Sequence, residues 1–139
     1  MLPPVIIVDD DEDEHDLMKE VWKELKVDYP LISFSSGKQL LDYLHADKPI
    51  PFLIISDINL PVMNGFQLRE KILSDDSSKF KGIPFIFWSG TATESQIKQA
   101  YDLSSHGFFI KTPAFKELQE IVKDIIAYWQ KSETPKFTD

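Results

Sequence analysis

The chain has 139 residues, enough for one well-buried core but too few for a second domain of ordinary size. Its 42% of hydrophobic residues indicates a globular protein, and 15 basic against 23 acidic residues give a formal charge of −8, which disfavours binding to nucleic acid or anionic membranes. The absence of cysteine excludes disulfides, thiolate metal sites and cysteine nucleophiles. No secretory signal opens the chain and no hydrophobic run approaches the roughly 20 residues that span a bilayer, so we expect a cytoplasmic protein.

Short hydrophobic runs alternate with longer segments of helical period, which is typical of βαβ units around a parallel sheet. Strands are predicted at residues 5–8, 31–34, 52–55, 83–88 and 107–111, and helices at residues 12–25, 38–45, 64–73, 94–103 and 115–129. Residues 75–82 are predicted to form a polar loop. The whole pattern predicts one domain over residues 4–131 and a tail over residues 132–139.

Parallel strands joined by right-handed helical crossovers form an open, doubly wound sheet. We therefore predict an α/β protein of the flavodoxin-like type, with a five-stranded parallel sheet in the order 2-1-3-4-5 and five helices. In such sheets ligands bind beyond the carboxyl ends of the strands, where the winding direction reverses. Functional side chains are therefore expected at that edge.

Four of the five predicted strands are followed by a charged or hydroxyl side chain. Asp9 and Asp10 follow the first strand, Asp57 comes shortly after the third, Ser89 closes the fourth, and Lys111 closes the fifth. In the expected strand order the first and third strands are neighbours, so the three aspartates converge. Carboxylates packed this closely repel one another and need a cation, and hard oxygen ligands with room for water suit Mg²⁺.

Each of these residues also has an ordinary structural explanation when it is taken alone. Asp57 could cap a turn, and Ser89 could be a turn residue. Lys111 could extend from a strand end into solvent, and residues 11–14 could be the acidic first turn of a helix. The joint occurrence of these residues at four strand ends favours a shared site.

The same residues lie in segments that resemble, in order, the motifs of response regulator receiver domains of two-component signalling. The segments are VDD at residues 8–10, DINLPVMNG at residues 57–65, SG at residues 89–90 and the lysine at position 111. The resemblance extends over roughly residues 4–131. It implies a single-domain response regulator that accepts a phosphoryl group from a sensor histidine kinase or a histidine phosphotransfer protein in a Mg²⁺-dependent reaction.

The resemblance also implies which residues perform this reaction. Asp57 would be the phosphoacceptor, and Asp9 and Asp10 the acidic pocket, with Asp10 a direct metal ligand. The main-chain carbonyl of Asn59 would complete the protein ligands. Phosphoryl transfer to a carboxylate needs in-line positioning and neutralisation of charge, which Mg²⁺ and Lys111 would supply. Such a chain is expected to be a signalling phosphoacceptor that catalyses its own phosphoryl transfer and dephosphorylation, and not an enzyme acting on other substrates.

Ser89 and Phe108 match the residues that change position in the family when the domain is phosphorylated. A phosphoryl group can recruit the Ser89 hydroxyl, and Phe108 would then turn from an exposed to a buried position. Phe109 faces the other side of the strand and is the better core candidate. The affected surface comprises residues 91–103, residues 108–112 and the last helix, and it is expected to bind a downstream protein or a second copy of the chain.

One departure from the family pattern is Thr112, which separates Lys111 from Pro113, whereas the family has proline directly after the lysine. Either the Lys111–Thr112 or the Thr112–Pro113 peptide bond could therefore be cis. Asn59 and Thr91 occupy the two positions that, in the family, tune how fast water removes the phosphoryl group.

Other classes of protein fit the sequence less well. A haloacid-dehalogenase-like phosphatase needs a second aspartate two residues after its nucleophile, where this chain has Asn59, which cannot protonate a leaving group. A nucleotide or flavin binder would carry a phosphate-binding loop where residues 9–12 are acidic. The remaining alternative is a receiver-fold interaction module that is not phosphorylated. His15, His45 and His106 lack partnering motifs and are predicted to be solvated surface residues.

Overall fold

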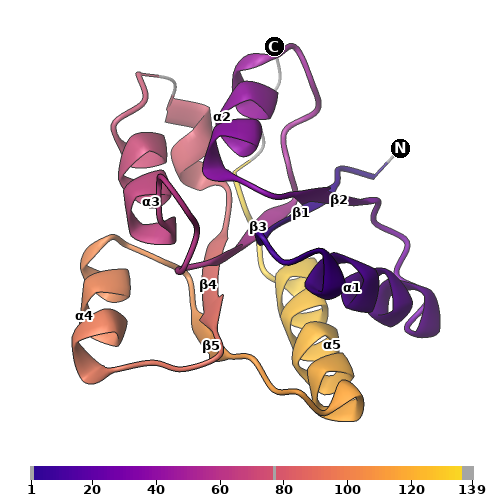
Figure 1. Cartoon of the computed structure of the whole chain (residues 1–139). Helices are drawn as coiled ribbons and strands as arrows, with labels where there is room; N and C mark the ends of the chain where they lie inside the picture. The colour runs from indigo at the N-terminus through magenta and orange to yellow at the C-terminus, as the bar shows by residue number, and fades with distance from the viewer. Residues whose placement is uncertain (1, 77, 136–139) are drawn as a thin grey trace.

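The structure is a computed structural model that describes residues 2–76 and 78–135, and its strands and helices alternate along the chain (Figure 1). The strands are β1 (Val5–Val8), β2 (Leu31–Phe34), β3 (Leu53–Asp57), β4 (Phe85–Ser89) and β5 (Phe108–Ile110). The α-helices are α1 (Glu12–Glu24), α2 (Gly37–His45), α3 (Gly65–Leu73), α4 (Glu94–Asp102) and α5 (Phe115–Lys131). A short 3₁₀ helix, Ser78–Gly82, lies between α3 and β4.

All five strands are parallel and pair in the order β2-β1-β3-β4-β5, as the sequence predicts. The strand β1 pairs with both β2 and β3, so Val8 lies between Phe34 and Ser56. Helices α1 and α5 cover one face of the sheet, and α2, α3 and α4 cover the other (Figure 1). The carboxyl ends of β1 and β3 therefore lie side by side at the edge where functional side chains were expected.

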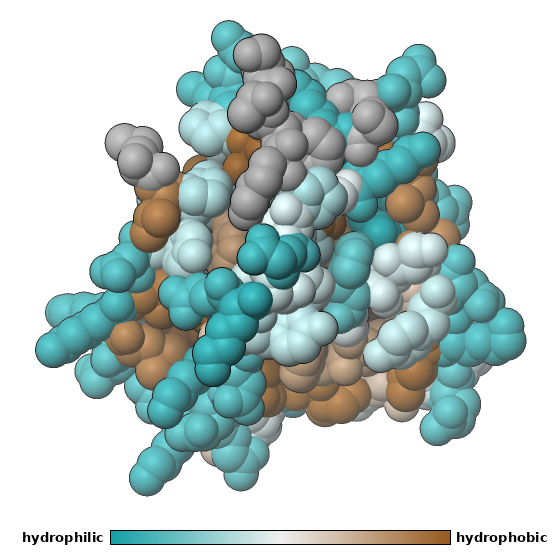
Figure 2. Space-filling model, turned by 180° about the vertical axis from the view of Figure 1, so that it is seen from behind, coloured by the Kyte–Doolittle hydropathy of each residue, from teal (hydrophilic) through white to brown (hydrophobic). Residues whose placement is uncertain are grey.

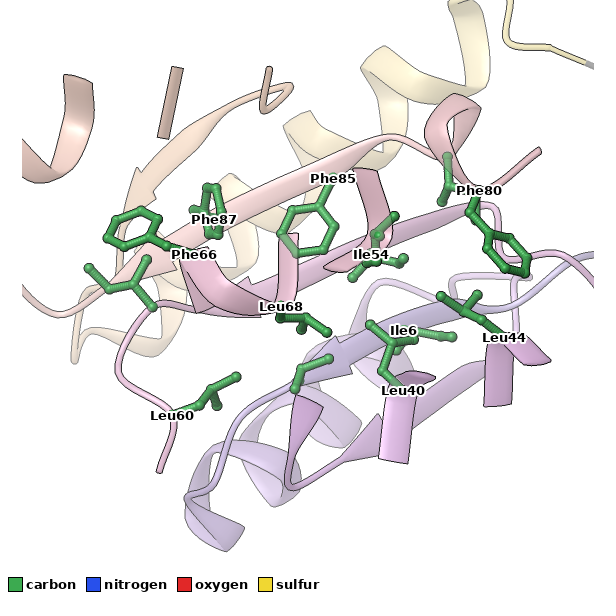
Figure 3. Close-up of a cluster of buried hydrophobic side chains, with 14 of the residues drawn as sticks. Ile6, Leu40, Leu44, Ile54, Leu60, Phe66, Leu68, Phe80, Phe85 and Phe87 are labelled. Carbon is green, nitrogen blue, oxygen red and sulfur yellow. The ribbon is translucent and has the colours of Figure 1, made fainter. Parts of the chain in front are cut away.

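Each face of the sheet packs against its own hydrophobic core. In β1, Ile6 and Val8 face the core under α2, α3 and α4, while Val5 and Ile7 face the core under α1 and α5. In the first of these cores Phe87 contacts two aromatic rings edge to face, Phe66 at 5.2 Å and Phe85 at 5.1 Å between ring centroids (Figure 3). Burial on both faces explains why the strands are continuous hydrophobic runs instead of alternating ones.

Side-chain caps begin four of the five helices. The capping residues are Asp11 for α1, Ser36 for α2, Asn64 for α3 and Thr93 for α4. In α3 and α4 a glutamine three residues after the cap completes a capping box. These caps satisfy backbone N–H groups that the helix itself leaves free, and they fix where the loops from β3 and β4 end.

The structure corrects the predicted ends of two strands and the predicted form of one loop. The strand β3 continues to Asp57, which was predicted to lie beyond it, and β5 ends at Ile110, so Lys111 lies one residue beyond the strand that it was predicted to close. Ser89 closes β4 as predicted. Residues 75–82 contain the 3₁₀ helix, and its Phe80 is only 3% exposed and belongs to the core beneath α2 and α3. A single aromatic side chain within a polar segment has no periodicity, which explains why the sequence pattern missed it.

The end of the chain agrees with the prediction only in part. Helix α5 continues to Lys131, two residues beyond its predicted end, and residues 132–135 follow without helix or strand. The rest of the predicted tail, residues 136–139, lies outside the described residues, so the domain limits at residues 4 and 131 stay a prediction. Within residues 2–76 and 78–135, no helix is long and hydrophobic enough to cross a membrane.

Candidate functional site

Lys111 joins two buried aspartates at the carboxyl edge of the sheet. Its Nζ lies 2.8 Å from Oδ2 of Asp9 and 3.0 Å from Oδ2 of Asp57. The Lys111 N–H donates to the Ser89 carbonyl at 2.7 Å, which continues the pairing of β4 with β5 and fixes the lysine backbone. The side chain then passes Trp88, whose ring centroid is 5.9 Å from Nζ. One ammonium group is therefore shared between a carboxylate directly after β1 and a carboxylate at the end of β3.

The second oxygen of each of these carboxylates accepts a hydrogen bond from a backbone N–H two residues further along the chain. Oδ1 of Asp9 accepts from Asp11 at 3.0 Å, and Oδ1 of Asp57 accepts from Asn59 at 2.9 Å. Such local bonds are a common way for aspartate to stabilise a turn. Here they orient both carboxylates so that the remaining oxygen faces Lys111.

Asp10 is exposed and adds a third carboxylate to the site. Oxygens of Asp9, Asp10 and Asp57 all lie within 4.8 Å of one another. Three carboxylates and the one ammonium of Lys111 leave two negative charges, which a single divalent cation would neutralise. Oxygen ligands open to solvent on one side fit a hard cation that keeps some of its water. The main-chain carbonyl of Asn59 stays a predicted ligand.

Burial and charge shift the pKa values of the groups at this site. Burial raises the pKa of Asp9, and the hydrogen bond from Lys111 offsets that rise only in part. Burial by itself would lower the pKa of Lys111, but the hydrogen bonds to Asp9 and Asp57 outweigh it, so the pKa of Lys111 is raised. The lysine is therefore a cation at neutral pH. Burial also raises the pKa of Glu14 on α1, a fourth carboxylate that the sequence analysis did not assign to the site.

Ser89 is fully buried at the end of β4 and lies next to Asn59. Its Oγ is 3.4 Å from the backbone nitrogen of Thr91 and 3.5 Å from Nδ2 of Asn59. The pairing of β3 with β4 places Asp57 opposite Trp88, so Ser89 is one residue beyond the phosphoacceptor candidate. The fold therefore gathers the hydroxyl, the three carboxylates and the lysine at one edge, as the sequence predicts.

Comparison with known proteins identifies the family. The family described as "Response regulator receiver domain" matches residues 5–123. The chain belongs to this family. Receiver domains are signalling modules of two-component systems, so the family predicted from the motifs is confirmed.

Several relatives are similar over almost their whole length. Response regulator Rcp1 of Synechocystis sp. is 26% identical over 139 residues, which cover 95% of this chain and 93% of that protein. The two-component response regulator ORR3 of Oryza sativa is 25% identical, covering 89% of this chain and 91% of that protein. These similarities place this chain among response regulators of about its own length.

Solved structures agree with the fold. The phosphorylated cyanobacterial phytochrome response regulator RcpA has a TM-score of 0.87 at 26% identity, covering 98% of this chain and 100% of that chain. The Mn²⁺-bound form of Rcp1 has a TM-score of 0.82 at 26% identity, covering 96% of this chain and 100% of that chain. Receiver domains bind a divalent metal at the aspartate cluster, and the three carboxylates here fit such an ion.

The two aromatic residues of β5 face opposite sides of the receiver sheet. Phe108 packs against the core under α2, α3 and α4, and Phe109 against the core under α1 and α5. Both are half-buried and each packs against a core, so burial does not distinguish Phe109 as the better core candidate of the two. The described residues contain no cis peptide bond, so the bonds on both sides of Thr112 are trans.

The histidine prediction was wrong for His15. His15 is only 6% exposed, and its Nε2 lies 2.6 Å from the Asp9 carbonyl oxygen. Its spacing from Met18 and Trp22 on the buried face of α1 is a signal that could have placed it inside. His45 and His106 are exposed as predicted, although each makes a hydrogen bond, His45 to Asp75 and His106 from the Phe85 N–H.

Proposed function

We propose that this receiver domain accepts a phosphoryl group on Asp57 from a phosphohistidine of a sensor kinase or a phosphotransfer protein, with Mg²⁺ as the cofactor. The observation that carries the proposal is the Lys111 ammonium held between Asp9 and Asp57 beside a third carboxylate. A purely structural ion pair would need one carboxylate and no exposed third one. The surplus of negative charge suits a site completed by a cation and a phosphoryl group.

The reaction follows from what each side chain can do. An Asp57 oxygen attacks phosphorus while the bond from phosphorus to the donor imidazole nitrogen breaks, and that nitrogen departs with the bonding electrons. Lys111 already touches Asp57 and can pair with an oxygen of the transferring group. Mg²⁺, when bound by Asp9, Asp10, Asp57 and the Asn59 carbonyl, supplies further charge neutralisation. Water attack on the resulting acyl phosphate would return the carboxylate, so the domain promotes both steps itself.

Ser89 is suited to report the phosphorylated state. Both of its hydrogen bonds are long, and in both its Oγ accepts, so the hydroxyl hydrogen is available to a phosphoryl oxygen. Movement of Ser89 would draw the following loop, which leads to α4, toward Asp57. Phe108 packs half-buried against the core under that helix, and we propose that it turns inward as the loop moves.

The output surface proposed here is formed by α4, β5 and α5. Tyr101, Ile110 and Tyr128 are its large exposed hydrophobic residues, with 59%, 48% and 63% exposure. Figure 2, a view from behind, shows hydrophobic residues reaching the surface in separate patches among polar side chains. Such residues suit a protein partner, which is either a downstream target or a second copy of the chain.

Phosphorylation can be tested by incubating the protein with Mg²⁺ and acetyl phosphate and measuring its mass. Wild type should gain one phosphoryl group, and Asp57→Asn should gain none. Asp57→Asn protein phosphorylated to the wild-type yield would overturn the acceptor assignment. A wild type that never gains mass would leave a non-phosphorylated interaction module as the better function.

The metal assignment has its own test, because an ion that binds the native state raises the thermal midpoint. Mg²⁺ should raise the midpoint of wild type and of Asp16→Ala, a control at another exposed aspartate near the start of α1. Asp10→Ala should lose this response. A full Mg²⁺ shift in Asp10→Ala would show that Asp10 is not a ligand.

A further inference from the structure

Asp9 is held by the fold through its backbone as well as its carboxylate. Its N–H donates to the Phe34 carbonyl of β2 at 3.0 Å. Its own carbonyl lies past the last paired residue of β1, where no neighbouring strand continues the ladder. His15 supplies a donor there, with Nε2 at 2.6 Å from the carbonyl oxygen. Because a carbonyl can only accept, this nitrogen carries the hydrogen.

The setting of His15 shows that this hydrogen bond is its main polar contact. The residue belongs to the first turn of α1, among exposed carboxylates, yet it is buried. Its other ring nitrogen is 3.9 Å from Oε2 of Glu12, too far for a hydrogen bond, and the Glu12 side chain is 82% exposed. A hydrophobic residue would fill this position at lower desolvation cost, so what the imidazole adds is the bond to Asp9.

We propose that His15 is a positioning residue for the divalent metal site. The Asp9 carbonyl and the Asp10 nitrogen belong to one rigid peptide plane. A bond to that carbonyl therefore sets the rotation of the plane and with it the direction in which Asp10 leaves the backbone. No hydrogen bond or ion pair of the Asp10 side chain is found among the described residues, so its backbone has to aim it toward Asp9 and Asp57. This inference rests on the proposed function, since it requires Asp10 to bind the metal.

Three substitutions separate this role from packing. His15→Phe keeps the ring volume and removes the donor. His15→Gln places an amide N–H where the histidine Nε2 was. His15→Asn places the amide N–H near the position of the histidine Nδ1, out of reach of the Asp9 carbonyl. Residues that orient metal ligands typically change metal affinity by about 10- to 100-fold when they are lost. We expect a Mg²⁺ dissociation constant about 10-fold or more above wild type for the Phe and Asn variants, and within about 3-fold of wild type for the Gln variant.

The measurement is a calorimetric Mg²⁺ titration of the full chain, with the thermal midpoint without Mg²⁺ recorded to show that each variant is folded. Wild-type affinity in His15→Phe or His15→Asn, or a Gln variant as weak as the Asn variant, would overturn the inference. If the Phe variant does not fold, the contrast between Gln and Asn decides. Failure of the proposed function gives a different result: wild type then shows no Mg²⁺ binding, or Asp10→Ala binds Mg²⁺ as tightly as wild type. Either result would refute both the proposed metal site and the positioning role of His15.

Discussion

Gly65 begins α3 at a point where this helix touches the backbone at the end of β3, beside the proposed phosphoacceptor Asp57. Its N–H donates to the Ile58 carbonyl at 3.0 Å. A Cβ added at Gly65 would lie 2.8 Å from the Ile58 Cα and still closer to the carbonyl oxygen of Asp57. These neighbours are backbone atoms, so no side chain can rotate away from the new methyl group. Gly65→Ala must therefore displace either α3 or the segment around Asp57.

Two opposing effects determine the size of the change. Alanine is favoured over glycine within a helix by up to about 1 kcal/mol, which would stabilise the variant. Forcing a methyl group into closely packed surroundings costs about 1 to 3 kcal/mol. Because the clash is with backbone atoms of Asp57 and Ile58, which cannot rotate away, we expect the second effect to win, with a net loss of about 1 to 2 kcal/mol in the free energy of unfolding.

Urea unfolding followed by circular dichroism measures this loss, and Gly90→Ala is a matched control. A Cβ at Gly90 would meet no atom within 4 Å, so this variant should stay within about 0.5 kcal/mol of wild type. Displacement of Asp57 should also reduce the Mg²⁺-induced rise in thermal midpoint in Gly65→Ala. Equal stability and equal Mg²⁺ response in the two alanine variants would refute the steric reasoning.

Three further predictions concern the loop after β3, the end of α2 and the Ser89 hydroxyl, the proposed switch residue. Val62 has a φ of 66° and a fully exposed side chain. Because asparagine tolerates this left-handed backbone better than valine, Val62→Asn should raise the free energy of unfolding by about 1 kcal/mol. An unchanged or lower urea midpoint for Val62→Asn would contradict this. The hydrogen bond to Asp75 raises the pKa of His45, so its stabilisation is complete below the unfolded pKa of 6.5 and is lost as the pH rises through the higher folded pKa. His45→Gln should remove that pH dependence of the urea midpoint, and identical profiles for variant and wild type would argue against it. Ser89→Ala should abolish the changes in amide hydrogen exchange that a beryllofluoride phosphoryl mimic causes in residues 91–112, whereas persistence of those changes would exclude Ser89 as their source.

The sequence by itself determined the order of elements and the composition of the site. Strands buried on both faces must be continuously hydrophobic, and helices that cover them must repeat every three to four residues, so both patterns are visible without a structure. Right-handed crossovers then leave few strand orders, and the order found brings Asp9, Asp10 and Asp57 together. Polar residues at or directly after the carboxyl ends of such strands, as with Ser89 and Lys111, have few positions available other than the shared edge.

Strand ends and buried polar residues were decided only by the tertiary structure. The strand β3 extends to Asp57 because β4 continues to pair with it, which depends on the register between two distant segments. An arginine within a helix is ordinarily a surface residue, yet Arg69 of α3 is only 1% exposed. Its Nε donates to the Leu103 carbonyl at 3.1 Å, and its Nη2 donates to the Ser104 carbonyl at 2.9 Å. Burial lowers its pKa to about 10. The partners of Arg69, like the Asp9 carbonyl that binds His15, are backbone oxygens at the ends of helices and strands. No residue pattern encodes such contacts, because only packing brings the side chain and the backbone oxygen within reach of each other.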